Sequence, residues 1–401
     1  MRHALLWSIV ILALPSLALA ETPSEESEEK ESSFNAESVY DKPFLMGVES
    51  ASLGGYVEGS MNYMREDGIA EGPAFELRRF NLFVHASIGT RMRLMSELEF
   101  EHGTEEIALE IAQIDYKIFR GLQLRFGILL PPIGAFNQNH DAPAWEFVGR
   151  PLVSTTIFPA TLSEPGAGLF GQFLFGDMGL SYQVYATNGL GPGITSNNTG
   201  RTSIPAGKRE GIFEFDNNPS LAVSGRLALR HFDVGELGLS GYWSQYNTYE
   251  VEGLQTDQKR SVTMLGVDYQ TSFSEVFEAR GEVGYAIIEK PEGAGPEIGS
   301  RQFGAHLDLI NTVWRPTLFK HQEAEFNINL RAEYVDYNIG EFTGTGQKRG
   351  DEVIALVPGI SFRPVSEAVI RANYRREWRY NLQRNAPTHR GVFQLGVATY
   401  F

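Results

Sequence analysis

The stretch Gly391-Val-Phe-Gln-Leu-Gly-Val-Ala-Thr-Tyr-Phe401 decides the fold class of this chain. Phe393, Leu395, Val397 and Phe401 share one parity along it, and the residues between them are mostly small or polar. A period of two predicts a β-strand with one strongly apolar face. Such a last strand suits a closed transmembrane β-barrel, which must complete its own sheet and present an apolar outer face. An edge strand of a soluble β-sandwich is the alternative.

Residues 1–20 have the features of a secretory signal. A basic start precedes a mostly apolar run, and Ala18-Leu19-Ala20 has the small-x-small form of a cleavage site. A membrane-anchor helix is the alternative, but the apolar run is short of the roughly 20 residues that a span requires. Pro15 also interrupts its end. The mature chain is therefore expected to start at Glu21, outside the cytoplasm.

Composition narrows the class of protein further. The chain has no cysteine, which excludes thiol chemistry and cysteine-ligated metals. Its net charge of −16 includes a tract rich in glutamate within residues 21–49, which predicts a disordered, acidic periplasmic leader. Strong acidity also argues against nucleic acid as a partner. Many aromatic residues (12%) and 42 glycines, without an apolar stretch for a helical span after the signal, favour a barrel.

From residue 50 to residue 401, apolar and polar residues alternate in run after run. Each run has about ten to fifteen residues, enough for a tilted strand that crosses a membrane. Tight turns such as Gly89-Thr90 and Gly176-Asp177 alternate with longer loops, one of them near 64–73. We therefore predict an all-β fold, a transmembrane antiparallel β-barrel of about sixteen strands, with fourteen or eighteen as alternatives. The expected strands are 51–63, 74–88, 91–102, 106–118, 122–130, 163–175, 178–188, 219–231, 236–248, 260–272, 275–287, 301–313, 323–337, 351–363, 366–379 and 389–401.

Charged side chains gather on the parity opposite the apolar one and are expected to line the pore. The residues predicted there are Arg79, His85, Arg125, Arg226, Arg280, Arg331, Arg371, Arg375 and Arg379. Arg371, Arg375 and Arg379 recur at every fourth residue, about 13 Å apart along a strand, which suits a ladder for anions. Inward-facing carboxylates offer the alternative of a wall of paired charges with little net field; they are Glu97, Glu99, Asp268, Glu282, Asp308 and Glu333.

The segment 131–165 is too long for a simple connection and carries aromatic residues that favour burial. We predict a constriction loop folded into the barrel. A structured loop packed outside the lumen is the alternative. The residues expected to form the constriction are Asn137, His140, Asp141, Trp145, Glu146 and Arg150.

Several motifs in this region resemble those of the phosphate-selective porins O and P. They are Phe126-Gly-Ile-Leu-Leu-Pro-Pro-Ile-Gly-Ala-Phe-Asn137, His140-Asp141, Arg150-Pro151, Ser163-Glu-Pro-Gly-Ala-Gly-Leu-Phe-Gly171, Asp115-Tyr116 and Tyr185-Ala-Thr-Asn-Gly-Leu190. The resemblance extends loosely over 50–401 and implies a sixteen-strand barrel, usually trimeric, with a basic lumen that conducts anions. The chain departs from that family between Pro131 and Pro165, where Arg150 is the one fixed positive charge against Asp141, Glu146 and Glu164. Phosphate selectivity therefore does not follow from the resemblance.

Other site chemistry is weakly represented in the sequence. His85 with Ser87, or His306 with Asp308, would be needed for a membrane hydrolase, yet no complete triad is evident. His140-Asp141 could ligate a metal, but no third ligand is visible, so no metal or cofactor is predicted.

The sequence favours a passive porin of the bacterial outer membrane. Its expected partners are membrane lipid, small ions or solutes and two further copies of the chain in a homotrimer. A structural or adhesive barrel with a loop-plugged lumen is the main alternative.

Overall fold

The computed structural model describes residues 46–48, 51–103, 105–208, 211–318 and 322–401. The expected signal peptide, 1–20, lies outside the described residues. So does most of the expected leader, 21–49. The short strand β1 (Met46–Val48) is the described part of that leader, and it pairs with Ala51–Leu53. The leader and signal assignments stay predictions.

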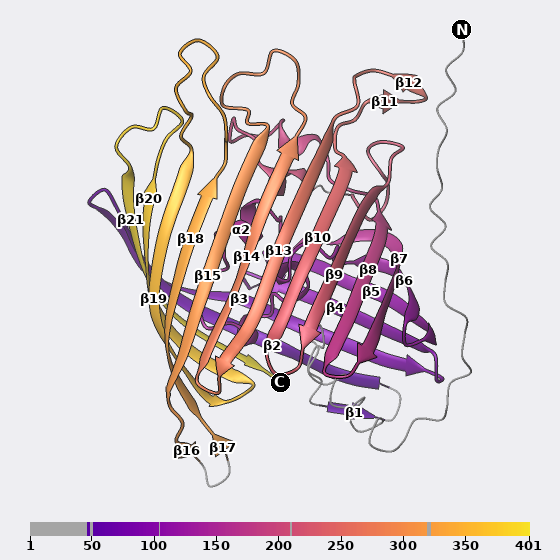
Figure 1. The fold of residues 1–401 in the computed structure, drawn as a ribbon, viewed down its shortest axis with the longest axis vertical. Coiled ribbons are helices and arrows are strands. Elements are labelled where there is room, and N and C mark those ends of the chain that lie inside the picture. The colour runs from indigo at the N-terminus through magenta and orange to yellow at the C-terminus, as the bar shows by residue number, and fades with distance from the viewer. Residues whose placement is uncertain (1–45, 49–50, 104, 209–210, 319–321) are drawn as a thin grey trace. The chain divides into compact units, whose positions relative to one another are not determined.

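A closed barrel of sixteen antiparallel strands makes up the body of the structure (Figure 1). Each strand pairs with the next along the chain, and the last pairs with the first, so the number and class of strands are as predicted. The strands are β2 (Ala51–Glu66), β3 (Ile69–Ile88), β4 (Met92–Glu101), β5 (Glu106–Phe119), β6 (Leu122–Leu129), β7 (Glu164–Phe175), β8 (Met178–Thr187), β9 (Ala222–His231), β10 (Gly235–Gln245), β13 (Ser261–Ser274), β14 (Phe277–Ile288), β15 (Arg301–Trp314), β18 (Glu325–Asp336), β19 (Glu352–Val365), β20 (Ala368–Arg379) and β21 (Thr388–Tyr400).

The terminal strand closes the sheet against β2. Tyr400 lies opposite Tyr56, and Gly55 and Phe401 exchange two backbone hydrogen bonds of 3.0 and 3.1 Å. The Phe401 ring stacks on Phe80 of β3, with 5.7 Å between centroids. Val397 and its apolar neighbours of the same parity are exposed on the outer wall. The pattern that predicted an apolar closing strand is therefore confirmed.

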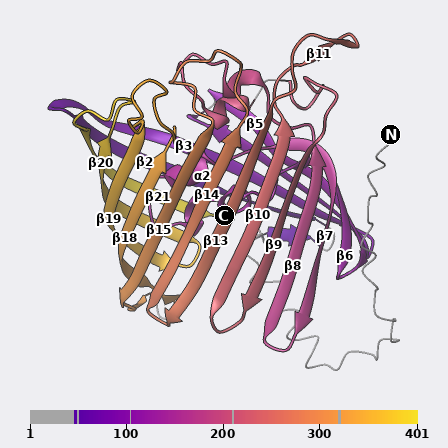
Figure 2. The same ribbon diagram turned by 45° about the horizontal axis from the view of Figure 1, so that its top comes forward.

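Most of the short connections lie at one end of the barrel, the turn end, and most of the longer ones at the other, the loop end (Figure 2). The hairpin β11–β12 (Glu250–Val251 and Leu254–Gln255) belongs to the loop end, and β16–β17 (Thr317–Leu318 and Gln322–Glu323) to the turn end. The predicted loop at 64–73 is wrong. β2 and β3 continue to a two-residue turn, Asp67-Gly68, in which both φ angles are positive, 44° and 95°. Asp-Gly is the favoured sequence for such a hairpin turn.

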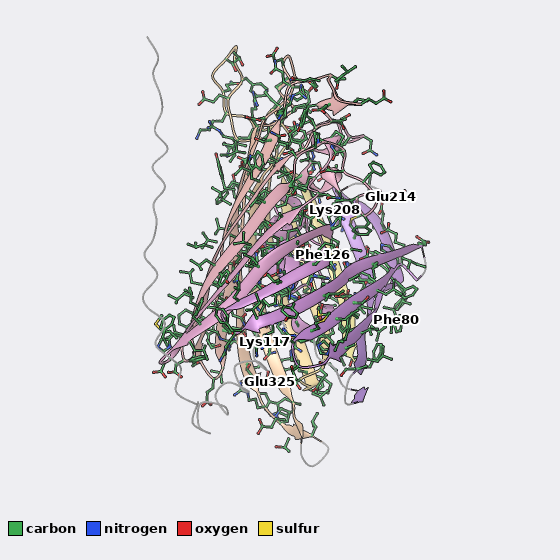
Figure 3. The ribbon with its side chains drawn as sticks, turned by 90° about the vertical axis from the view of Figure 1, so that its right-hand side faces the viewer. Phe80, Lys117, Phe126, Lys208, Glu214 and Glu325 are labelled. Carbon is green, nitrogen blue, oxygen red and sulfur yellow. The ribbon has the colours of Figure 1, made fainter. Side chains whose placement is uncertain are left out.

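The outer wall is apolar, as a lipid-facing surface requires. Phe80 and Phe126 project outward from β3 and β6 (Figure 3), and Phe126 is 67% exposed. Further exposed apolar residues follow the strands around the barrel: Val184, Leu227, Leu239, Leu265, Ile328, Leu356, Ile370 and Val397. Among the described residues, no helix is long and apolar enough to cross a membrane.

A hydrophobic cluster lies inside the barrel, between its wall and the segments that enter from the loop end. It contains Val153, Ile157 and Phe158 from the connection after β6, together with wall residues such as Met264 and Ala286. The short helix α2 (Leu152–Thr156) lies within this packing, as Figure 1 shows.

Three glycines on adjacent strands, Gly266, Gly284 and Gly304, pair with one another across β13, β14 and β15. We call them the glycine row. A Cβ atom on any of them would come within 2.9 Å of Phe158 or Val153. The missing side chains therefore allow the entering segment to lie directly against the wall.

Candidate functional site: a loop across the barrel lumen

The connection 130–163 between β6 and β7 folds into the barrel. It contains the 3₁₀ turns η1 (Phe136–Gln138) and η2 (Ala142–Ala144) before α2. The His140 ring contacts Glu110 of β5, and the Leu152 N–H donates to Glu333 of β18 at 2.9 Å. This loop therefore contacts strands β5 and β18, which lie far apart in the order of strands around the barrel. The predicted constriction loop is confirmed, and the alternative of a loop packed outside the barrel is wrong.

Arg371 of β20 is the main anchor of this loop. Its Nη1 donates to the backbone carbonyls of Ala142, Trp145 and Phe147, each at 2.9 Å, and its Nη2 to Glu58 at 3.2 Å. The side chain is almost completely buried. Nη1 carries two hydrogens, so the three carbonyls share them, and this one residue holds three successive parts of the loop.

The predicted constriction residues make further contacts inside the barrel. Glu146 accepts from Arg363 at 2.7 Å and also from the Ser361 hydroxyl. Burial alone would raise the pKa of Glu146, but these two partners hold it below its ordinary value. Trp145 packs on Phe136 with 4.7 Å between ring centroids. The loop therefore carries a fixed negative charge and an aromatic pair into the lumen.

Asn137 joins the two ends of the loop. Its Nδ2 donates to the Pro131 carbonyl at 2.8 Å, and its Oδ1 accepts from the Leu162 N–H at 2.8 Å. Asp141 accepts from the Tyr400 hydroxyl at 3.1 Å, which fastens the loop to the closing strand. These contacts close the segment on itself and against the wall.

Each predicted pore arginine has a carboxylate partner. The pairs are Arg79 with Glu58 (2.7 Å), Arg125 with Asp115 (2.7 Å), Arg226 with Asp268 (2.5 Å), Arg280 with Glu278 (3.3 Å), Arg331 with Asp308 (2.6 Å), Arg371 with Glu58 (3.2 Å), Arg375 with Glu333 (2.5 Å) and Arg379 with Glu377 (2.7 Å). The structure therefore has the alternative arrangement, in which the wall arginines are paired with carboxylates, and not a row of unpaired arginines. His85 lies on the inner parity of β3 and is half-buried.

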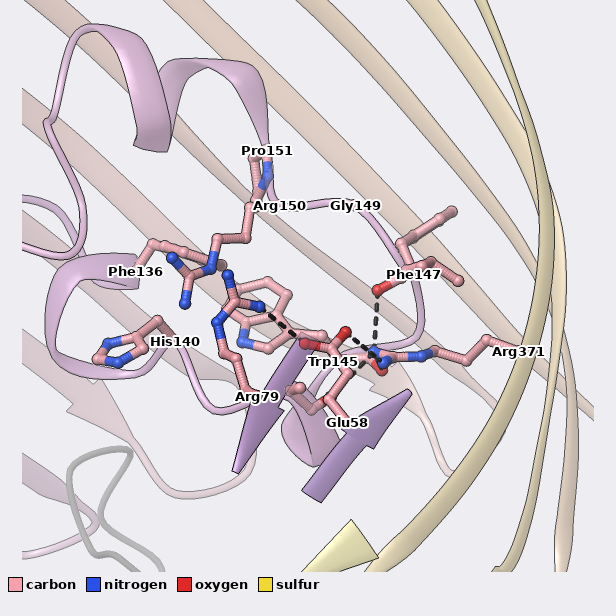
Figure 4. Close-up of a pocket in the computed structure, with 12 residues that line it drawn as sticks. Glu58, Arg79, Phe136, His140, Trp145, Phe147, Gly149, Arg150, Pro151 and Arg371 are labelled. Carbon is pink, nitrogen blue, oxygen red and sulfur yellow. Dashed lines mark hydrogen bonds and ion pairs between the residues drawn. The ribbon is translucent and has the colours of Figure 1, made fainter. Parts of the chain in front are cut away.

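A small cavity remains between the loop and the wall formed by β2, β3 and β20 (Figure 4). Glu58, Arg79, His140, Arg150 and Arg371 are among the residues that line it. Nε and Nη2 of Arg150 are buried without a hydrogen-bond partner in the described part of the chain. Arg79 and Arg371 share Glu58, and Arg79 also pairs with Glu101 at 2.8 Å, whereas Arg150 has no ion-pair partner among the described residues.

Two important residues of this site, Glu58 and Glu110, were not predicted. Glu58 shares the inner parity of its strand with Tyr56 and Ser60, so the alternation could have identified it. Glu110 could not be found in this way. It is the extra residue of a β-bulge, where Glu97 pairs with Ile111 and Leu98 with Leu109. A bulge changes the side-chain parity of a strand.

His306 and Asp308, one of the pairs considered for a membrane hydrolase, are not arranged as part of a triad. Asp308 gives both oxygens to Arg331, at 2.6 and 2.7 Å, so it is engaged away from His306. A triad requires the carboxylate to orient the histidine that activates the nucleophile.

Comparisons with known proteins agree with the barrel. No family model matches the chain. An uncharacterized protein from Aquifex aeolicus (strain VF5) is 25% identical over 353 residues, which cover 82% of this chain and 76% of that one.

Three solved structures illustrate the likeness in fold. The outer membrane channel DcaP of Acinetobacter baumannii aligns with a TM-score of 0.57 and 13% identity, over 90% of this chain and 100% of its own. The anion-selective porin from Comamonas acidovorans aligns with a TM-score of 0.55 and 12% identity, over 88% and 99% of the two chains. OmpF of Salmonella typhi has a TM-score of 0.55 at 9% identity, over 88% and 98%. At these identities the likeness concerns the fold, and membership of the phosphate-selective family stays a prediction.

Proposed function

We propose that this chain is an outer-membrane porin, a passive diffusion channel for small hydrophilic solutes and ions. The observation that carries the proposal is the combination of a closed barrel, apolar outside and ionised inside, with a loop that enters its lumen. An ionised inner face requires water or charged partners, and an apolar outer face requires lipid. The barrels of an outer-membrane channel and an anion-selective porin have the same fold.

The cavity beside Arg150 lies between the loop and the wall, and we take it as the part of the route where the loop meets passing ions and solutes. The wall arginines contribute little net field, because each is compensated by a carboxylate. A weak preference for anions, phosphate included, would therefore come from Arg150, whose guanidinium faces the cavity with unused donors.

The proposed setting is the bacterial outer membrane, with the turn end in the periplasm and lipid against the exposed apolar wall. We also propose a homotrimer, on the basis of the resemblance to porins O and P. Chemical cross-linking of the protein in its native membrane would reveal the trimer, and a monomer alone would contradict it.

A structural or adhesive barrel, plugged by its own loop, is the second candidate. It is favoured by the number of bonds that hold the loop across the lumen, with Arg371 alone bonding to three loop carbonyls. If those bonds persist in the membrane, solutes would not pass.

Single-channel recording in a planar bilayer separates the two candidates. The folded parent chain is recorded beside a variant that lacks part of the loop between Asn137 and Thr156. A porin conducts in both forms, with a larger conductance after deletion. A parent that is silent while the folded deletion variant conducts would establish the plugged barrel and refute the porin.

A further inference from the structure

A buried group of side chains lies on the inner wall beside the cavity, and the proposed passage of solutes does not explain it. Glu97 of β4, Glu110 of β5 and His140 of the loop each contribute one atom to it, and these atoms lie within 4.8 Å of one another. All three side chains are buried, and His140 Nε2 is 3.0 Å from Glu110 Oε2. The sequence had offered His140 as a possible ligand without visible partners; the fold supplies two carboxylates.

The bulge in β5 brings Glu110 into this group. Its neighbours Ile111, Gln113 and Asp115 follow the inner parity, and Glu110 is buried in addition to them. By the alternation of Ile111, Gln113 and Asp115 alone, Glu110 would point toward the membrane. Bulges often redirect a side chain at functional sites.

One hydrogen bond fixes the role of one ring nitrogen of His140. Nδ1 lies 3.0 Å from the Asn137 carbonyl oxygen, which can only accept, so Nδ1 carries a hydrogen. Nε2 faces the carboxylate of Glu110 at 3.0 Å; it donates a proton there when no metal is bound and becomes a ligand when that proton is released. A backbone carbonyl that holds the far nitrogen is the usual outer-shell partner of a metal-binding histidine.

Two further polar groups beside the carboxylates lack a partner. The Asn81 amide donates to Glu97 at 2.8 Å and to Glu99 at 3.2 Å, while its Oδ1 accepts nothing from the described residues. The Tyr56 hydroxyl, opposite Asn81 on the next strand, is also unbonded within the described chain and interacts electrostatically with Glu99 and Glu97. Both side chains have a relative exposure of 0%. Unpaired buried oxygens carry a free-energy cost that a bound cation would relieve.

We propose that Glu97, Glu110 and His140 bind one divalent transition-metal ion of the zinc class. One imidazole nitrogen with carboxylate oxygens suits zinc or a related ion, whereas calcium and magnesium prefer oxygen ligands alone. Zinc ligands lie about 2.0–2.2 Å from the ion, so two ligand atoms of a tetrahedral site are about 3.4 Å apart. His140 Nε2 and Glu110 Oε2, at 3.0 Å, are already close enough, and any pair near the 4.8 Å limit must approach by more than about 1 Å. The bound ion would join the loop to the β4–β5 wall.

Titration calorimetry with Zn²⁺ tests the proposal on the untagged, chelator-treated chain folded in detergent. The expected result is one Zn²⁺ per chain. His140→Gln and Glu110→Gln should each weaken binding more than about tenfold, because even outer-shell partners contribute about 10- to 100-fold. The control is His102→Gln: His102 pairs with Glu76 at 2.8 Å on a half-exposed turn and should leave the affinity unchanged.

Co²⁺ provides a second readout that does not depend on stability. Its visible absorption bands report ligands directly, and the bands of the parent should be lost in His140→Gln and kept in His102→Gln. Folding of each variant is verified on a denaturing gel, where the unheated folded barrel migrates differently from the heated sample. Absence of stoichiometric Zn²⁺ binding by the folded parent would overturn the proposal, and so would equal affinity in folded His140→Gln. In either case His140 and Glu110 form only an ion pair.

Discussion

Replacing Arg371 by glutamine should release the loop from the wall. The substitution removes the donor of three 2.9 Å bonds to loop carbonyls and one partner of Glu58. A hydrogen bond to a charged group contributes about 1.5–3 kcal/mol, and breaking a buried ion pair costs about 3–5 kcal/mol. Glu58 keeps Arg79 at 2.7 Å, so the lower part of that range applies. We therefore expect a loss of about 3 kcal/mol in loop anchoring, which is roughly a hundredfold change in the loop's equilibrium.

Single-channel recording measures this change directly. In the parent, the anchored loop should give one steady conductance level. In Arg371→Gln, the loop should leave the wall often enough to add a second, larger level or to raise the mean conductance. The unheated protein should still migrate as a folded barrel, because the strands keep their backbone ladders.

The matched control is Arg376→Gln on the same strand. Arg376 lies on the outer parity, with its guanidinium 5.7 Å from the Trp378 ring centroid. Its loss should leave conductance and noise at the parent level. A folded Arg371→Gln protein with the current trace of the parent would refute the anchoring argument.

Four further outcomes follow from the structure. Deleting Phe401 removes the ring stack on Phe80 and the bonds to Gly55, so the heat-modifiable, membrane-inserted fraction should fall; unchanged assembly would contradict the role of the closing strand. Shortening the loop between Asn137 and Thr156 should enlarge the conductance of a folded barrel, and an unaltered conductance would mean that the loop does not limit the pore. Arg150→Glu should shift the reversal potential in a salt gradient toward cations, whereas the same potential in parent and variant would remove Arg150 from selectivity. Lys208 is an exposed residue that follows the 3₁₀ turn Ile204–Gly207; desolvation of its ammonium group and the charge of Arg150 lower its pKa to about 8, so its positive charge is present at neutral pH and lost above about 8. Anion preference should therefore weaken between about pH 7 and pH 9, and a Lys208→Met variant that keeps this dependence would disprove the assignment.

The barrel could be predicted because its strands obey a simple rule. Period-two alternation identified all sixteen strands, and the ionised parity identified the arginines that face inward. Which carboxylate compensates which arginine could not be predicted, because that depends on cross-strand register. Arg331 and Asp308, for example, meet because β15 and β18 align them side by side.

The inside of the barrel was only partly predictable. The length and aromatic content of the loop indicated that it folds inward, but they contain no information on where its carbonyls meet Arg371. Glu110 could not be predicted for a different reason. One extra residue in β5 reverses the alternation by which residues are assigned to the inner or the outer face. The Asp67-Gly68 turn, by contrast, was visible in the sequence and was overlooked.

The glycine row determines how closely the loop lies against the barrel wall. Gly266, Gly284 and Gly304 form a shallow recess in the wall, and Phe158, Ile157 and Val153 lie in it. A single methyl group on any of these three glycines would push the loop toward the barrel axis. Related barrels could therefore change their aperture without any change in loop sequence, by filling or emptying the recess behind it. In this architecture, the width of the lumen depends on the residues of the barrel wall as well as on the loop.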